Sequence, residues 1–164
     1  MQSAKDSFYM ALRDRLAVVN PGRTVVLEGT SQPAIVVTEN EAVSGDVLAL
    51  DCFHLKFGAA ATPQSYRTGD VPLVSLQCAV SYATRGSSED GVGRGRSLGA
   101  LDEELFAICS PLRVPICDYT KTPPAPISTN AFWTMPELGE VESSGSELQR
   151  TATLTLYFFA KESA

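Results

Sequence analysis

The chain has 164 residues, of which 44% are hydrophobic and 20% are charged, a balance typical of one globular domain with a buried core and not of a disordered chain. Its formal net charge is −6 and its 13 lysines and arginines are scattered, so we expect no nucleic-acid partner. We also expect no membrane partner and no signal peptide, because every apolar run is far shorter than the roughly 18 residues of a spanning helix and the N-terminus is polar.

The first expected element is an amphipathic helix over residues 3–19. Its apolar stripe repeats at spacings of three and four residues and consists of Phe8, Leu12, Leu16 and Val19. Asn20-Pro21-Gly22 should end this helix, because proline disfavours helical geometry in the residue before it and glycine suits the exit turn. Two short valine-rich strands are predicted next, over residues 24–28 and 34–38.

Two longer strands are expected over residues 47–57 and 74–82, with residues 58–72 as the loop between them. In the first strand, one face carries Phe53, Leu55 and Phe57, and the other carries Cys52, His54 and Lys56. The second strand alternates most regularly, with Val74, Leu76, Cys78, Val80 and Tyr82 opposite Ser75, Gln77, Ala79 and Ser81. This alternation predicts one face on a core and one face toward solvent or a partner.

A second helix is predicted from a stripe that consists of Leu98, Leu101, Leu105, Ile108 and Cys109. Glycines crowd its beginning, and each costs about 1 kcal/mol against alanine inside a helix. The helix should therefore become firm only near Ser97, whose side chain can serve as the N-cap. Arg85, Arg94 and Arg96 would then lie on a flexible arm suited to contact an acidic neighbour.

The last third of the chain is expected to begin with a proline-rich connector over residues 110–131 that has no regular structure. Residues 131–136 and 140–142 suggest one broken strand or two. A final strand is predicted over residues 150–162, with Leu154, Leu156 and Phe158 on one face and Thr153, Thr155 and Tyr157 on the other. We therefore predict an α+β fold in a single domain, residues 1–164. It has a mostly antiparallel sheet of about four to six strands, with two helices packed on one face.

The glycine-rich stretch at residues 90–106 is not a phosphate-binding loop. A dinucleotide fingerprint requires a third glycine where the chain has Arg96 or Leu98, and a Walker-type loop requires a Gly-Lys pair that the sequence lacks. Cys52 and His54 lie about 6.5–7 Å apart along one strand face. Asp51 points to the opposite face and cannot orient them, so a structural or interface histidine is the default interpretation.

The acidic residues, the cysteines and the tryptophan also indicate no catalytic or metal site. Asp102, Glu103 and Glu104 follow each other on a helix, about 100° apart, so they cannot converge on a metal ion and should form a solvated face. The four cysteines contain no Cys-x-x-Cys pair, so we expect buried free thiols and no zinc or redox motif. Trp133 is expected to anchor the core. We predict a protein without enzymatic activity, cofactor or metal.

Four segments together suggest a family. They are FYMALRDRLAVVNPGRTVVLEG, LVSLQCAVSYATRG, RGRSLGALDEELFAI and LQRTATLTLYFFA, within which the matching positions are Ala11-Leu12, Arg15-Leu16, Pro21-Gly22, Arg85-Gly86 and Arg150. In this order they resemble the tail terminator, or tail completion, proteins of long-tailed bacteriophages and phage-derived injection machines. The resemblance implies a structural subunit of a ring, typically of six copies, that caps the tail tube, halts its growth and presents a surface to the head.

The resemblance implies further copies of this chain, a tail tube protein and a head–tail connector protein as partners. It also implies the host bacterial cytoplasm during assembly, and then the virion tail or injection particle, as locations. For the contact between subunits we expect basic residues to meet acidic residues of a neighbour, and the candidates are Arg13, Arg15, Arg85, Arg94, Arg96, Asp102, Glu103 and Glu104. Two alternatives remain: another neck or tube assembly protein on a related fold, and a small thiol hydrolase that uses Cys52 and His54.

Overall fold

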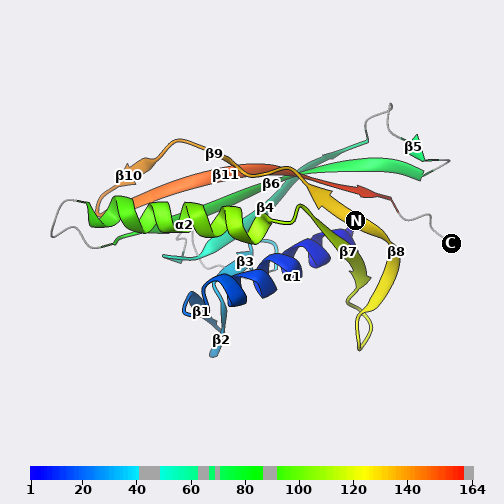
Figure 1. Ribbon diagram of the computed structural model, residues 1–164, viewed down its shortest axis with the longest axis horizontal. Helices are drawn as coiled ribbons and strands as arrows, with labels where there is room; N and C mark the ends of the chain where they lie inside the picture. The colour runs from blue at the N-terminus through cyan, green and yellow to red at the C-terminus, as the bar shows by residue number, and fades with distance from the viewer. Residues whose placement is uncertain (41–48, 63–66, 69–70, 87–91, 161–164) are drawn as a thin grey trace.

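The computed structural model describes residues 1–40, 49–62, 67–68, 71–86 and 92–160 (Figure 1). Over these residues the fold is α+β, with two helices and a mostly antiparallel sheet, as predicted, and the sheet is curled. The helices are α1 (Gln2–Val19) and α2 (Gly93–Cys109). The strands are β1 (Thr24–Leu27), β2 (Thr30–Pro33), β3 (Ile35–Val37), β4 (Phe53–Ala61), β5 (Arg67–Thr68), β6 (Val71–Thr84), β7 (Arg113–Asp118), β8 (Ala125–Trp133), β9 (Glu137–Leu138), β10 (Glu142–Ser144) and β11 (Glu147–Phe159).

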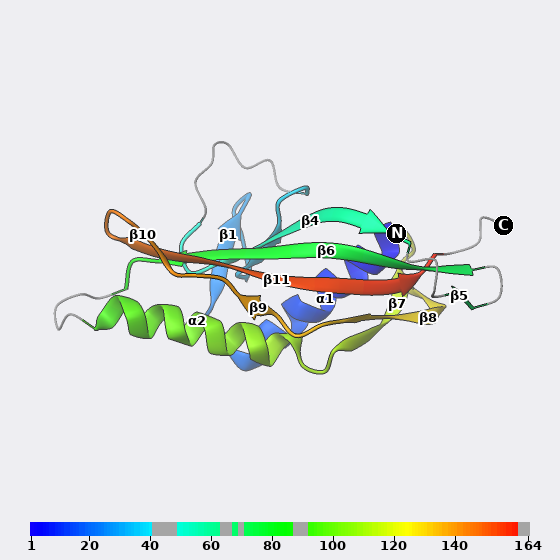
Figure 2. The ribbon, with the colours of Figure 1, turned by 90° about the horizontal axis from the view of Figure 1, so that it is seen from above.

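The long strands β6 and β11 form the centre of the sheet. They pair antiparallel from Thr84 opposite Leu148 to Leu73 opposite Phe159, and Figure 2 shows them running side by side along the molecule. The sheet order is β3-β4-β6-β11-β8-β7, with the short strands β5, β9 and β10 attached at its margins. The hairpin β1–β2 forms a separate small sheet, and it projects on the same side of the molecule as α1 and the β7–β8 hairpin (Figure 1).

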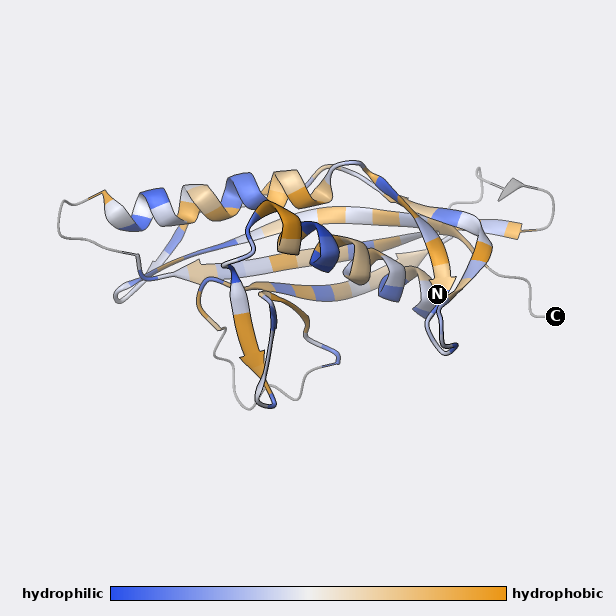
Figure 3. Ribbon diagram, turned by 60° about the horizontal axis from the view of Figure 1, so that its bottom comes forward, coloured by the Kyte–Doolittle hydropathy of each residue, from blue (hydrophilic) through white to orange (hydrophobic). Residues whose placement is uncertain are grey.

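The core contains the apolar stripes of both helices and the inward side chains of β6 and β11. The predicted alternation of the long strands is confirmed, and it is visible in Figure 3 as alternating bands of hydropathy along the ribbons. One cluster of buried side chains includes Phe8, Leu12, Leu16, Leu101, Leu105, Ile108, Leu76, Val80, Leu154 and Leu156. Burial of such side chains contributes roughly 1.5–3 kcal/mol each, which makes this cluster the main source of stability.

The strand β4 is shifted along the chain relative to the prediction. Residues 49–52 precede it without strand structure, and residues 47–48 lie outside the described part of the chain. The strand continues through Gly58 to Ala61, which we expected in a loop. Small residues carry no alternation signal, but Ala60 and Ala61 pair with β6 after a shift in register, so backbone pairing with a neighbour overrides local composition.

The expectation of an irregular connector over residues 110–131 is wrong. This stretch contains β7 and most of β8, which pair with each other as an antiparallel hairpin. Its prolines are compatible with strands because β7 is the last strand of the sheet order and because the register shifts between Pro115 and Cys117.

The start of α2 also differs from the prediction. The helix begins at Gly93, and Ser97 lies inside it, where its Oγ donates to the carbonyl of Gly93 at 3.0 Å instead of capping the end. Gly86 brings the end of β6 close to this first turn, with φ at +50° and space so tight that a Cβ would lie 2.8 Å from the Cα of Arg94. Arg94 therefore belongs to a helix and not to a flexible arm; Gly91 lies outside the described residues.

Candidate functional site

Arg15 stabilises a junction inside the chain. Its Nη1 donates to the carbonyls of Ile108 at 2.9 Å and Pro111 at 2.7 Å, and its Nη2 donates to the carbonyl of Arg113 at 3.2 Å. Carbonyls in the last turn of a helix lack partners within the helix and attract positive charge. Arg15 thus binds the end of α2 and the start of β7 from its position on α1. Burial lowers the pKa of this guanidinium below its ordinary value.

Trp133 completes the same junction and anchors the core, as predicted. Its Nε1 donates to the carbonyl of Cys109 at 2.9 Å, and the Arg15 guanidinium lies 5.4 Å from the centroid of its ring. The ring of Phe8 meets it edge-on at 4.8 Å between centroids. The indole is therefore held by a hydrogen bond, a cation–π contact and an aromatic contact at once.

Asp102 does not lie on a solvated face, so that expectation is wrong for this residue. Its carboxylate accepts a hydrogen bond from the hydroxyl of Tyr82 at 2.6 Å and lies 3.5 Å from Nη1 of Arg150. Burial of Tyr82 and its hydrogen bond to Asp102 raise the pKa of the phenol. The Nε of Arg150 is buried and has no hydrogen-bond partner within the described part of the chain. This group joins α2 to β6 and β11.

Glu104 is also paired within the chain, which corrects the same expectation. It accepts hydrogen bonds from Nε of Arg23, from Nη2 of Arg23 at 2.9 Å and from Nδ2 of Asn20 at 2.7 Å, and its side chain is only 13% exposed. Glu103 between them is exposed, as expected. Successive helix residues point in directions about 100° apart, so Asp102 turns toward the sheet while Glu104 turns toward the end of α1.

The remaining candidate arginines are spread over the molecule. Arg13 is half-buried on α1, and Arg94 and Arg96 lie in the first turns of α2. Arg85 follows β6 and pairs with Glu147, at 3.0 Å from its Nη2 to Oε1. The structure thus brings Arg85 to β11 but does not gather the eight candidates into one patch. Their contact with a neighbouring copy stays a prediction.

Cys52 and His54 do not form an activated pair. Burial raises the pKa of the Cys52 thiol to about 12, which opposes the thiolate that a nucleophile requires. Burial also lowers the pKa of His54, whose Nε2 lies 3.2 Å from the carbonyl of Ala49. These environments argue against the thiol hydrolase. Within the described ranges, no three side chains of His, Cys, Asp and Glu gather as metal ligands.

The middle of the outer side of the two central strands carries no charged side chain, and we call this part the polar sheet face. It consists of Ser75, Gln77, Ala79 and Ser81 on β6 and Thr151, Thr153, Thr155 and Tyr157 on β11. The register places Ser81 opposite Thr151 with 2.9 Å between their hydroxyls, and Nε2 of Gln77 donates to Oγ1 of Thr155 at 3.2 Å. The alternation along each strand was predicted, whereas these cross-strand pairs follow only from the register.

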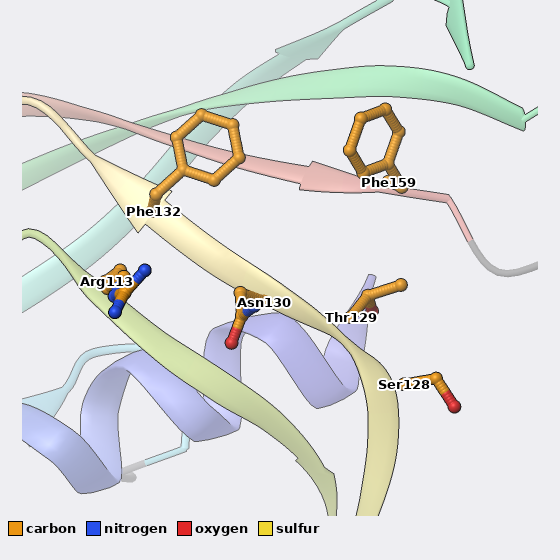
Figure 4. Close-up of a pocket in the computed structure, with 6 residues that line it drawn as sticks. All are labelled: Arg113, Ser128, Thr129, Asn130, Phe132 and Phe159. Carbon is orange, nitrogen blue, oxygen red and sulfur yellow. The ribbon is translucent and has the colours of Figure 1, made fainter.

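A second surface was missed by the sequence analysis because it lies in the predicted connector. Where β8 separates from β11 there is a hollow of about 490 Å³, the β8 groove, lined by Arg113, Ser128, Thr129, Asn130, Phe132 and Phe159 (Figure 4). The signal for its strand was present: Ile127, Thr129, Ala131 and Trp133 alternate with more exposed residues. A shallower hollow of about 340 Å³ lies between the C-terminal ends of the helices, beside Val18 and Ala107.

No protein-family model matches the sequence, and no curated protein matches it. Among the described residues, neither helix combines the length and apolar character that a membrane crossing demands.

Proposed function

We propose that this protein is the structural subunit of a ring that caps a phage-like tail tube, ends its growth and joins it to the head. Its partners are then further copies of the chain, the tail tube protein and the head–tail connector protein, and it needs no cofactor or catalytic residue. In this proposal the subunit assembles in the host bacterial cytoplasm and remains in the virion tail or injection particle. The resemblance of the element order to tail terminator proteins supports this assignment.

The polar sheet face is the observation that carries the proposal. Charged residues are depleted at the centre of protein interfaces, because removing them from water is costly, and the eight side chains of this face have hydroxyl, amide, methyl and phenol groups only. The charged residues Lys56 of β4 and Glu137 of β9 flank it, beside Ala79 and Thr153. Its cross-strand hydrogen bonds hold the side chains in place before any partner arrives. In the proposed ring both helices cover the opposite face of the sheet and leave the polar sheet face to a neighbour.

The first experiment measures assembly directly. The purified protein is examined by light scattering and negative-stain microscopy, alone and after mixing with tail tubes built from the cognate tube protein. We expect rings of uniform mass and tubes that carry a ring at one end and stop growing. A protein that stays monomeric at high concentration and ignores tube ends contradicts the proposal. A protein that polymerises into tubes itself supports the alternative of a tube protein.

A matched pair of variants locates the interface. Gln77→Glu keeps the shape of the side chain but puts a carboxylate at the centre of the polar sheet face, and burying an unpaired charge costs several kcal/mol in each contact. We expect the ring mass to fall to that of the monomer with an unchanged circular dichroism spectrum. Gln32→Glu, on β2, introduces the same charge away from this face and should assemble normally. Equal assembly of both variants would remove the polar sheet face from the interface.

A further inference from the structure

The β8 groove borders a strand edge without a partner. β11 pairs with β8 only through Leu156 opposite Trp133 and Tyr157 opposite Phe132. Toward Ala125, β8 keeps β7 on one side and has no strand on the other within the described residues. Figure 4 shows this part of β8 diverging from β11, with Asn130 and Thr129 beside the opening. An edge of this kind offers free backbone N–H and C=O groups to an added strand.

The side chains of the β8 groove favour a particular kind of strand. Arg113 is exposed, and its guanidinium has no hydrogen bond or ion pair to any residue that the structure describes. Phe132 is 38% exposed and stacks on Tyr157 with 5.6 Å between ring centroids, which gives the groove an apolar wall. A hollow of about 490 Å³ is within the range of sites that hold small ligands or a few side chains. An acidic strand with an apolar side chain fits these groups.

The chain itself has such a segment shortly after β8. Residues 137–142, which we call the acidic edge, read Glu-Leu-Gly-Glu-Val-Glu. They run along β11 through β9 and the start of β10, and Val141 is 46% exposed between Glu140 and Glu142. Glu140 has no partner among the residues described, whereas Glu142 accepts a hydrogen bond from Gln149 at 2.7 Å.

Within one molecule the two surfaces lie at different positions along β11. Figure 1 shows β10 at one end of the sheet and β8 toward the other. The acidic edge pairs with β11 from Thr153 to Gln149, and the groove residue Phe132 pairs with Tyr157, so roughly 13 to 26 Å of strand separate them. Two different, complementary surfaces of a subunit make a head-to-tail contact, the type of contact that generates closed rings.

We propose that the acidic edge of one copy binds the β8 groove of the next copy. Its backbone extends the free edge of β8, and its carboxylates pair with Arg113. The inference rests on the proposed ring and adds to it a specific contact, with a second copy of the chain as the occupant.

Charge exchange in the full-length protein tests the contact. Arg113→Glu and Glu140→Arg each place like charges opposite one another, and each should weaken self-association about tenfold in light scattering or sedimentation. The double variant exchanges the two charges and should recover most of the association. Lys121→Glu, an exposed position at the tip of the same hairpin, is the control and should assemble like the wild type. Unchanged association of both single variants, or no recovery in the double variant, overturns the contact.

Tube capping by the same samples separates this inference from the proposed function. Rings that cap tubes, and whose assembly is unchanged by Arg113→Glu and by Glu140→Arg, contradict only the contact. Rings whose assembly is weakened by each of the two substitutions, but which leave the tube length unchanged, contradict only the capping function. A wild-type chain that remains monomeric overturns the contact even if single copies bind tube ends. Binding of acidic strands from the tube protein at Arg113, without self-association, would replace the second copy as occupant.

Discussion

Two neighbouring regions of the molecule place an arginine in opposite environments. At the helix junction, the guanidinium of Arg15 donates hydrogen bonds to three backbone carbonyls, one of which belongs to Arg113. At the β7–β8 hairpin, the side chain of Arg113 itself is exposed and has no partner in the described residues. The two residues are in contact, yet one stabilises the fold and the other is open to a second molecule.

The difference comes from the backbone around each residue. A helix end leaves carbonyl groups without partners, so a nearby cation is bound within the chain. In a strand, side chains alternate between the two faces, and those on the outer face of an edge hairpin meet no other element. Charge alone therefore does not identify an interface residue, because its neighbours decide whether the charge is already paired.

The largest expected effect compares two adjacent residues of β8. Trp133→Ala removes a buried ring that contacts Phe8 and Arg15, and should lower the free energy of unfolding by about 3–5 kcal/mol. Phe132→Ala removes an exposed ring stacked on Tyr157 and should cost about 1 kcal/mol. Urea unfolding at one fixed protein concentration measures both. Similar losses would mean that the hairpin is packed as tightly as the junction.

A smaller effect is expected at the junction arginine. Arg15→Met keeps the aliphatic stem but leaves the carbonyls of Ile108, Pro111 and Arg113 without their donor, and should cost about 2 kcal/mol. Arg13→Met, on the same helix, should change stability by less than about 0.5 kcal/mol. Thermal and urea unfolding of the two variants provide the comparison. If Arg13→Met is the more harmful change, the assignment of Arg15 to the fold is wrong.

The acidic residues of α2 allow the same comparison between a paired and an exposed side chain. Glu104→Gln weakens the hydrogen bonds and the ion pair to Arg23 and Asn20, and should cost about 1 kcal/mol of unfolding free energy. Glu103→Gln changes an exposed side chain and should be neutral within about 0.5 kcal/mol. Both are measured by urea unfolding. If Glu104→Gln leaves the free energy of unfolding unchanged, Glu104 is again a candidate for the contact between subunits.

The smallest effect is a dependence on pH at His54. Burial lowers the pKa of this imidazole below its ordinary value of 6.5, so the unfolded chain binds the proton more readily than the folded chain. The contribution of His54 to stability should therefore decrease as the pH falls below that value. The difference in unfolding free energy between the wild type and His54→Gln, followed from about pH 7.5 to about pH 5.5, should shift in favour of the variant. A difference that is independent of pH contradicts this assignment.

The sequence predicted those elements whose evidence is local. α1 is recognised from Phe8, Leu12 and Leu16, and β6 from the alternation that ends at Tyr82, because the period of the apolar residues reflects the period of the backbone. The prediction failed for β8, where the prolines outweighed the alternation from Ile127 to Trp133, and for Gly58–Ala61, where small residues hide the period. In both segments, pairing with a neighbouring strand decides the structure. The start of α2 was misplaced because a serine inside a glycine-rich stretch resembles a cap.

The candidate surfaces divide in the same way. The uncharged outer side of β6 and β11 is a property of alternate residues along each strand, so the sequence alone determined its composition. The pairing of Arg15 with Ile108, of Asp102 with Tyr82 and Arg150, and the separation of β8 from β11 were decided only by the tertiary structure. These contacts join elements far apart in the sequence, and their geometry depends on how the helices pack on the sheet, whereas periodicity depends only on the next few residues.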